Sequence, residues 1–316
     1  MDTQFITTNE SPTILVEKVE GNLRLKGQDE YQVTAKSDHP DDLSLETRGA
    51  EVMVRSMGDL SLRVPRQATV KVQAAHGEVV AKALDGLLEI GAAHGNVTLR
   101  GVAETHLDVV HGELAAKNIA GTLTINKVDG NTAVRDVQGD FIVSDAIEGN
   151  LQLNEVNGDA SATVRGNLTI RLDPSPSHNY AFTAGGNLFC QLAEDASVEI
   201  SIPSANKVSV NMPEMRASAP VMTPYALTLG DGDAHMTLSA GGNIVLDSHA
   251  PDWSMDDLDI GIGEEINGMA SAIGEQIEQQ IEAQMRMVDE QLNAQIGMLS
   301  TRLGAARLSE EQARHI

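Results

Sequence analysis

Apolar residues between residues 77 and 166 return in a fixed pattern of three positions in about every nine residues. Each unit opens on a glycine or a substitute for it, and apolar side chains follow two, four and seven places later, as residues 121–129 and 149–157 show. The first two positions have the spacing of a strand, so their side chains should share one face while the residues between them face the other way. The pattern predicts short strands that each bury one face.

The glycines that open the units are spaced too regularly for independent strands. They lie eight to ten residues apart, at Gly77, Gly86, Gly95, Gly112, Gly121, Gly130, Gly139, Gly149, Gly158 and Gly166, with Ala103 in the one position without glycine. A nine-residue unit cannot bury its apolar face alone, so the units must stack on one another. Glycine is expected at these corners because it adopts backbone angles that residues with a Cβ avoid. The chain therefore predicts a β-solenoid.

The residues that precede these glycines indicate how many units make one coil. His76, His94 and His111 recur at every second corner, whereas the corners between them carry other residue types. Equivalent corners are thus two units apart. This predicts a flattened, two-sided β-helix of about 18 residues per coil, with coils stacked about 4.8 Å apart.

The chain divides into three parts by its pattern. Residues 1–75 hold less regular strands, which are expected to cap the first coil, and residues 76–250 hold the solenoid repeats, with a proline-rich loop near residues 212–224. Residues 251–316 form a linker and a helical segment. The predicted fold class is mainly β: a β-solenoid followed by a long C-terminal amphipathic helix.

The helical segment carries apolar residues eleven positions apart, which is three turns at 3.67 residues per turn and gives one long apolar face. We call this face the tail stripe and expect it to carry recognition: Ile277, Ile281, Met285, Val288, Leu292, Ile296 and Leu299. It could cover the solenoid, self-associate as a coiled coil, or dock on another helical protein. Its polar face is rich in Glu and Asp, which disfavours an amphipathic membrane anchor.

Charge and cysteine content indicate which ligands and which kinds of chemistry are disfavoured for this chain. The formal charge of −24 disfavours nucleic acid and anionic membranes as ligands and favours basic protein partners. The single cysteine, Cys190, lies in a strand-like segment and is expected to be a small buried side chain rather than a nucleophile. No secretory signal pattern and no run of apolar residues long enough to span a membrane is present, so the expected location is the cytoplasm.

The stretch from Leu60 to Pro65, through Val70 to Val72 and Gly77 to Val79, precedes repeated corners of glycine, Asn or Asp and alternating apolar residues. This arrangement over about residues 10–170 resembles the putative-adhesin family of β-strand repeat proteins, also called the Toastrack domain. A weaker likeness is to bactofilins, which are cytoskeletal β-helices. The first resemblance implies a non-enzymatic domain, in some members linked to cell-envelope stress.

Three features of the sequence could carry chemistry or could have only structural roles. Stacked imidazoles of His76, His94 and His111 could share a metal or repel one another when protonated, but a straight ladder suits tetrahedral geometry poorly. The acidic corners, with residues 230–233, lack the paired glycines of calcium-binding nonapeptides and are interpreted as turns. A glycan-degrading β-helix needs clustered carboxylates and aromatic platforms, and the only tryptophan, Trp253, lies outside the repeats.

The sequence therefore favours a non-enzymatic cytoplasmic scaffold or interaction protein, without catalytic residues, cofactor or metal. Its tail stripe is expected to mediate self-association or docking to a protein partner, without nucleic-acid binding or membrane insertion. A surface adhesin and a carbohydrate-active β-helix enzyme are the alternatives.

Overall fold

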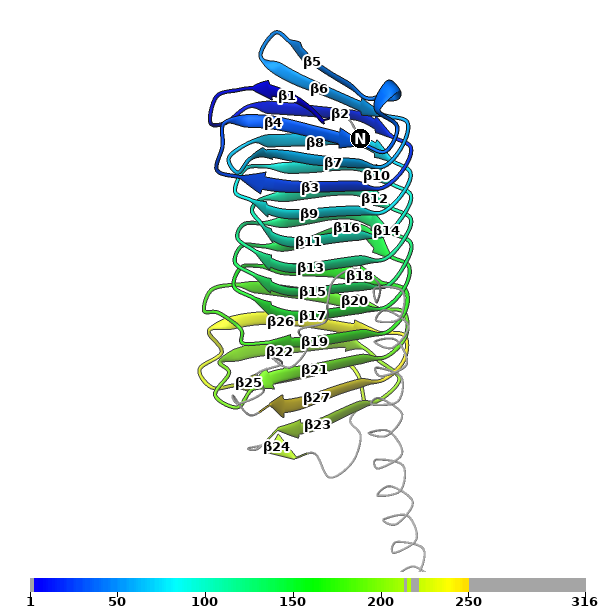
Figure 1. Cartoon of the computed structure of the whole chain (residues 1–316). Coiled ribbons are helices and arrows are strands. Elements are labelled where there is room, and N and C mark those ends of the chain that lie inside the picture. The colour runs from blue at the N-terminus through cyan, green and yellow to red at the C-terminus, as the bar shows by residue number, and fades with distance from the viewer. Residues whose placement is uncertain (1–2, 213–214, 217–221, 250–316) are drawn as a thin grey trace, which may run out of the picture.

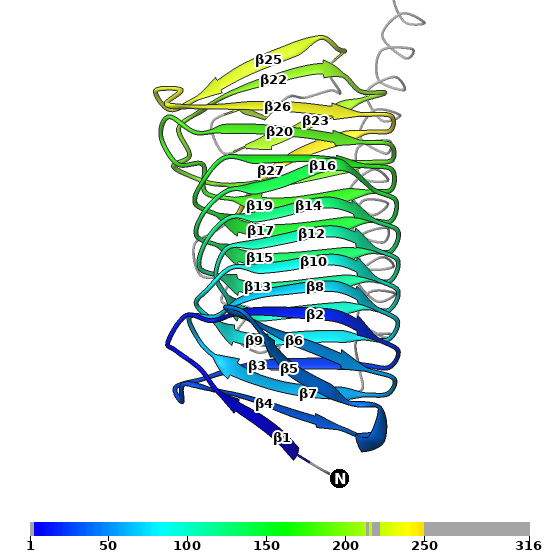
Figure 2. The ribbon, with the colours of Figure 1, turned by 90° about the horizontal axis from the view of Figure 1, so that it is seen from above.

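The computed structural model describes residues 3–212, 215–216 and 222–249, and in these the chain is mainly β, with one short 3-10 helix at Pro40–Asp42. The predicted C-terminal helix and its tail stripe lie outside the described residues. The strands form two sheets of 14 and 13 strands, here sheet A and sheet B, which face each other along a stack of coils (Figure 1, Figure 2).

Sheet A contains, in spatial order, β1 (Thr3–Thr7), β4 (Gln32–Ser37), β7 (Leu60–Pro65), β3 (Leu23–Gln28), β9 (Val79–Leu84), β11 (Val97–Val102), β13 (Leu114–Ile119), β15 (Thr132–Val137), β17 (Leu151–Val156), β19 (Leu168–Leu172), β21 (Leu188–Ala193), β27 (Ile244–His249), β23 (Val208–Met212) and β24 (Met215–Arg216). Sheet B contains, in the opposite spatial order, β25 (Tyr225–Leu229), β22 (Val198–Ser204), β26 (Ala234–Ala240), β20 (Asn179–Ala184), β18 (Ala160–Val164), β16 (Phe141–Ile147), β14 (Leu123–Val128), β12 (Thr105–Val110), β10 (Leu88–Ala93), β8 (Thr69–Ala75), β2 (Thr13–Val19), β6 (Glu51–Ser56) and β5 (Ser44–Arg48).

From β8 to β21 the chain alternates between the two sheets, so each strand pairs in parallel with the strand two places away in sequence. Leu88 is in register with Val70 of the preceding coil on one side and with Thr105 of the following coil on the other. Two units thus make one coil, as the histidine spacing predicted. The repeat is solenoid-like, and residues at equivalent positions stack into columns.

Both ends of the stack are built out of sequence order. At the N-terminal end β2 and β3 lie between the β6–β7 coil and the β8–β9 coil. At the other end β26 and β27 insert between the β20–β21 coil and the β22–β23 coil, which places the yellow strand β27 between green strands in Figure 1. Strands before residue 76, which were expected only to cap the first coil, therefore also belong to the parallel stack. The glycine spacing does not indicate this, because the outermost coil at this end, β6–β7, comes after β2 and β3 in sequence.

Antiparallel strands form all four sheet edges. Sheet A ends in β1 and β4 at one end and in β24 at the other, and sheet B ends in β5 and β25. Open edges of parallel sheets would present unpaired backbone groups to another chain, and an added antiparallel strand changes the pattern that such a chain would have to match.

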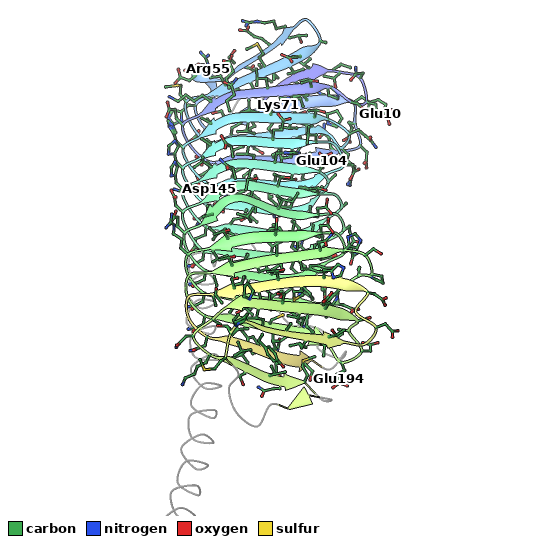
Figure 3. The ribbon with its side chains drawn as sticks, turned by 180° about the vertical axis from the view of Figure 1, so that it is seen from behind. Glu10, Arg55, Lys71, Glu104, Asp145 and Glu194 are labelled. Atoms are coloured by element: carbon green, nitrogen blue, oxygen red, sulfur yellow. The ribbon has the colours of Figure 1, made fainter. Side chains whose placement is uncertain are left out.

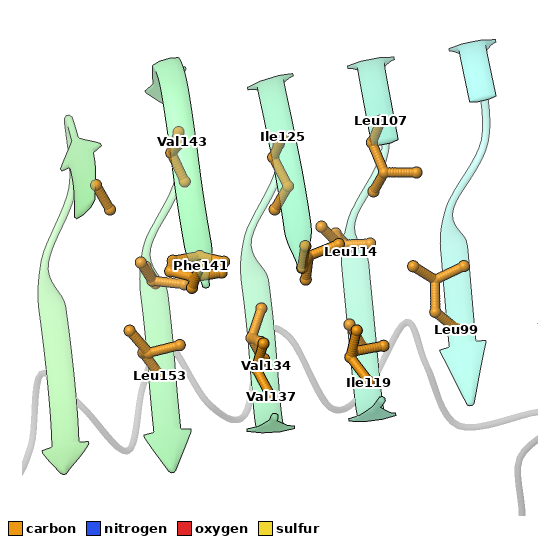
Figure 4. Close-up of a cluster of buried hydrophobic side chains, with 14 of the residues drawn as sticks. Leu99, Leu107, Leu114, Ile119, Ile125, Val134, Val137, Phe141, Val143 and Leu153 are labelled. Carbon is orange, nitrogen blue, oxygen red and sulfur yellow. The ribbon is translucent and has the colours of Figure 1, made fainter. Parts of the chain in front are cut away.

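The core includes the residues two, four and seven places after the corner positions from Gly77 to Gly149, and these are buried as predicted. Figure 4 shows side chains from both sheets filling the space between them, including Leu99, Leu114 and Leu153 of sheet A and Ile125 and Phe141 of sheet B. The layer is narrow and mostly aliphatic, which accounts for the low aromatic content.

In sheet A, backbone conformation explains why the last inward side chain of each unit lies three residues after the previous one. One residue per coil lies in the left-handed region just before the last inward side chain, with φ of 56–60°: Ala83, Gly101, Asn118, Asp136 and Glu155. This residue is omitted from the ladder pairing, so the strand bends there and the next inward side chain falls three residues later instead of two.

The glycines at the corners have a different role from the predicted one. Those of the described corners have no φ in the left-handed region, which among glycines is adopted only by Gly49, Gly101, Gly230 and Gly232. A Cβ on Gly95 would instead lie 2.6 Å from the carbonyl carbon and oxygen of Gly77 in the next coil. The corner glycines are therefore required by close backbone stacking and not by unusual backbone angles.

Candidate functional site

Stacked coils convert each surface position into a column, and the columns are the candidate sites. The first runs along the corner between sheet B and sheet A. The imidazoles of His76 and His94 meet edge to face with ring centroids 4.8 Å apart, and those of His94 and His111 stack with centroids 4.9 Å apart. Carboxylates close both ends: Glu20 contacts Nδ1 of His76, and Oδ2 of Asp129 lies 2.7 Å from Nδ1 of His111.

A carboxylate thus borders the histidine column at each end. Within the described residues no group of three His, Cys, Asp or Glu side chains is placed to hold a metal ion. The acidic residues 230–233 likewise form a turn, in which the Ser197 hydroxyl accepts hydrogen bonds from the backbone amides of Asp231 and Asp233. The hydrogen bonds at residues 230–233 agree with the turn role predicted for them.

The carboxylates beside the histidines give the fold an acid-sensitive edge. Hydrogen bonds from Lys127, and then from His111, hold the pKa of Asp129 below its ordinary value. Since the folded-state pKa is the lower one, this contribution to stability is present above pH ~4 and is lost as the pH falls through the folded-state value. We expect wild type to lose more stability than Asp129→Asn in urea titrations between pH 5 and 2. Parallel losses in the two proteins would contradict this.

A ladder of asparagines lies two residues beyond the histidine column. The side-chain oxygen of each accepts a hydrogen bond from the backbone amide of the next coil, as Asn150 does from Asn167 at 2.8 Å and Asn167 from Asn187 at 2.8 Å. Glu113 occupies this column between Asn96 and Asn131. Its Oε2 is buried without a hydrogen-bond partner, and burial raises the pKa of its carboxyl.

Replacing this carboxylate should stabilise the protein at neutral pH. Because the folded-state pKa of Glu113 is raised, its ionisation lowers stability as the pH rises above ~4.3. Glu113→Gln should therefore raise the free energy of unfolding at pH 7 by about 1 kcal/mol, the scale of one unsatisfied buried acceptor. The gain should vanish below pH ~4. Glu78→Gln, at the matched position two coils away, is the control. A loss of stability at pH 7, or a gain that persists at pH 3, would count against this account.

Cys190 lies in β21 and is fully buried, as expected from its strand-like surroundings. Burial raises the pKa of its thiol to about 12, so almost no thiolate forms at neutral pH. In native buffer the thiol should stay unlabelled by an aromatic disulfide reagent, and it should react fully once the protein is unfolded in denaturant. Complete labelling of native protein within minutes would refute this.

A column of basic residues on the outer face of sheet A was not recognised in the sequence. Ladder register places Arg63 beside Lys26, Lys26 beside Lys82, and then Arg100, Lys117 and Arg135 on successive strands. Asn154 and Arg171 continue the same column on β17 and β19. We call this set the basic column: Arg63, Lys26, Lys82, Arg100, Lys117, Arg135 and Arg171. The available signal was the regular spacing of its four central members, which recur once per coil.

The outer face of sheet B carries charged side chains of both signs that pair with one another, unlike the basic column of sheet A. A shallow groove of about 470 Å³ crosses β8, β10, β12 and β14, and Figure 3 shows Lys71 on this face, toward the N-terminal end of the stack. Its charged side chains are paired with one another, as in the 2.8 Å contact between Lys71 Nζ and Glu89 Oε2. Asp108 accepts a hydrogen bond from Asn126 at 2.9 Å. Groups that satisfy one another in this way form a solvated face rather than a convergent reactive centre.

The predicted tail stripe lies outside the described residues, so its position is not part of this geometry. Within the described residues no helix is long and apolar enough to span a membrane.

Comparison with known proteins gives structural neighbours but no family match. No family model and no curated protein matches the sequence. Among solved structures, a putative adhesin from Bacteroides fragilis is 10% identical, with 78% of this chain and 96% of that chain covered and a TM-score of 0.33. A putative lipid binding protein from Parabacteroides distasonis is 11% identical, with 78% and 96% covered and a TM-score of 0.36. A putative cell adhesion protein from Clostridium sporogenes is 11% identical, with 78% and 98% covered and a TM-score of 0.18. The structural neighbours thus include putative adhesins, the family whose repeats the sequence resembles.

Proposed function

We propose that this chain is a non-enzymatic scaffold and interaction protein, in which a stack of β-coils forms a rigid spacer and the tail stripe mediates assembly or docking of a protein partner. The observation that carries the proposal is the contrast between the ends of the stack and its faces. Antiparallel strands form the sheet edges, whereas the faces carry side chains in ordered columns.

The antiparallel edges favour recognition through side chains over recognition through the backbone. A second copy that continued the parallel coils end to end would need a parallel edge strand to extend, and the antiparallel strands β1, β5, β24 and β25 occupy those positions here. Assembly is therefore assigned to the C-terminal segment, whose eleven-residue apolar period provides a face long enough for helical pairing. The proposal places the protein in the cytoplasm with a protein partner.

Molar mass in solution tests this function. We expect the mass of the full chain to rise with protein concentration above that of the monomer. The combined change Ile281→Ser, Met285→Ser and Val288→Ser should keep it monomeric, because it removes the middle of the tail stripe. The combined change Gln276→Ser and Gln279→Ser, on the polar face, is the control and should assemble like wild type. A full chain that stays monomeric over the whole concentration range would refute assembly through the tail.

A further inference from the structure

The outer face of sheet A is buried at positions where a solenoid surface is normally open to solvent. Phe189 and Val245 face outward from adjacent strands, in register with each other, and both are only 1% exposed. Thr98, at the same column position on β11, is 5% exposed. On sheet B the corresponding outward residues Ala181 and Thr237 are exposed. Every described strand belongs to one of the two sheets, so none of them covers this face.

The basic column runs beside these residues along the same face. Like charges placed directly opposite each other on neighbouring strands are destabilising unless an opposite charge approaches them. The column spans seven coil steps from Arg63 to Arg171, which is about 34 Å at the usual strand separation. Within the described part of the chain, Lys82, Arg100 and Lys117 form no ion pair. Burial also lowers the pKa of the Arg171 guanidinium, although this side chain projects from an outer face.

We propose that the outer face of sheet A is the docking site for residues 251–316 of the same chain, with the tail stripe against the apolar positions and acidic side chains against the basic column. The segment carries thirteen acidic and four basic residues, so its charge is complementary to the column. Its acidic residues are Asp252, Asp256, Asp257, Asp259, Glu264, Glu265, Glu275, Glu278, Glu282, Asp289, Glu290, Glu310 and Glu311.

Length and starting point favour this occupant. The described chain leaves sheet A at His249, at the end of β27, and nine coil steps of about 43 Å separate β27 from β7. A helix over residues 264–303 would be about 60 Å long, enough to pass every member of the column. The stretch 213–221 is held at both ends and reaches out only about 15 Å. Thr98 lies about 34 Å from β23, so that stretch cannot cover it.

This inference deepens the proposed function, because the tail stripe is taken as the binding element in both. A stripe docked on its own sheet A is hidden from other chains. The docked tail and the assembled tail are therefore competing states of one segment, and tethering makes docking within the chain the resting state.

Zero-length cross-linking of the full chain tests the docking. A carbodiimide joins lysine amines to nearby carboxylates, so Lys82 and Lys117 should link to acidic residues of 251–316, whereas Lys18, Lys71 and Lys127 of sheet B should not. An equimolar mixture of unlabelled and 15N-labelled protein distinguishes links within a chain from links between chains. Arg100→Glu with Lys117→Glu should lower the Lys82 links to the tail about tenfold, the combined effect of two reversed surface charges. Lys71→Glu with Lys127→Glu, on sheet B, is the matched control and should leave them unchanged.

The outcomes separate the inference from the proposed function. Links within one chain, lost on charge reversal in sheet A only, support docking even if the molar mass never exceeds that of a monomer. Links only between chains, links mainly to sheet B lysines, or no links to the tail overturn docking, while a concentration-dependent mass would still support assembly.

Discussion

Phe141→Ala should lower the free energy of unfolding by about 3–5 kcal/mol, among the largest effects expected from a single core substitution in the described part of the chain. Phe141 is fully buried in β16 and is held between Leu123 and Ala160 of the neighbouring coils. Because the coils above and below are fixed by ladder hydrogen bonds, the interior cannot collapse to fill the space that the ring leaves.

Urea unfolding followed by circular dichroism measures this effect. The control is Ile142→Ala at the next residue, which points outward and is half-buried, and should change stability by less than about 1 kcal/mol. Equal losses for the two variants would show that the assignment of inward and outward faces in β16 is wrong.

Gly95→Ala is also expected to have a large effect, a loss of about 3 kcal/mol from overpacking. The new Cβ would lie 2.6 Å from the backbone of Gly77, and backbone cannot move aside without shifting the neighbouring coil. Gly101→Ala is the informative comparison. Its Cβ would have no heavy atom within 4 Å, so only its positive φ of 58° opposes the change, at about 1–2 kcal/mol.

Thermal unfolding of the two glycine variants checks this order. A smaller loss for Gly95→Ala than for Gly101→Ala would mean that the corner glycines serve backbone conformation after all, as their spacing alone first indicated.

The periodicity of the sequence was sufficient to predict the two-unit coil and the residues that fill its interior. The inward positions of each unit follow from local alternation, so residues such as Leu123 and Ile125 could be placed correctly, and the two-unit coil followed from three histidines. The order of the end coils could not be predicted, because β2 and β3 pair with strands far from them in sequence and no local pattern encodes that choice.

The basic column was missed for a related reason. Its central members recur once per coil and become neighbours only after the coils stack, and the net charge of −24 gives no indication of a local basic surface. Thr98 and Phe189 also differ from the expected pattern, because they face outward and are nevertheless buried, whereas outward positions of a solenoid are expected to be exposed. A comparison of charge between positions one coil apart would have identified the column.

We expect the side-chain columns on the outer face of sheet A to control whether the C-terminal segment assembles. Molar mass measured against concentration for the Arg100→Glu, Lys117→Glu variant of the full chain tests it most directly. We predict that release of the tail lets this variant assemble at a lower concentration than wild type, while the sheet B control Lys71→Glu, Lys127→Glu assembles like wild type. Identical assembly curves for all three proteins would contradict the claim.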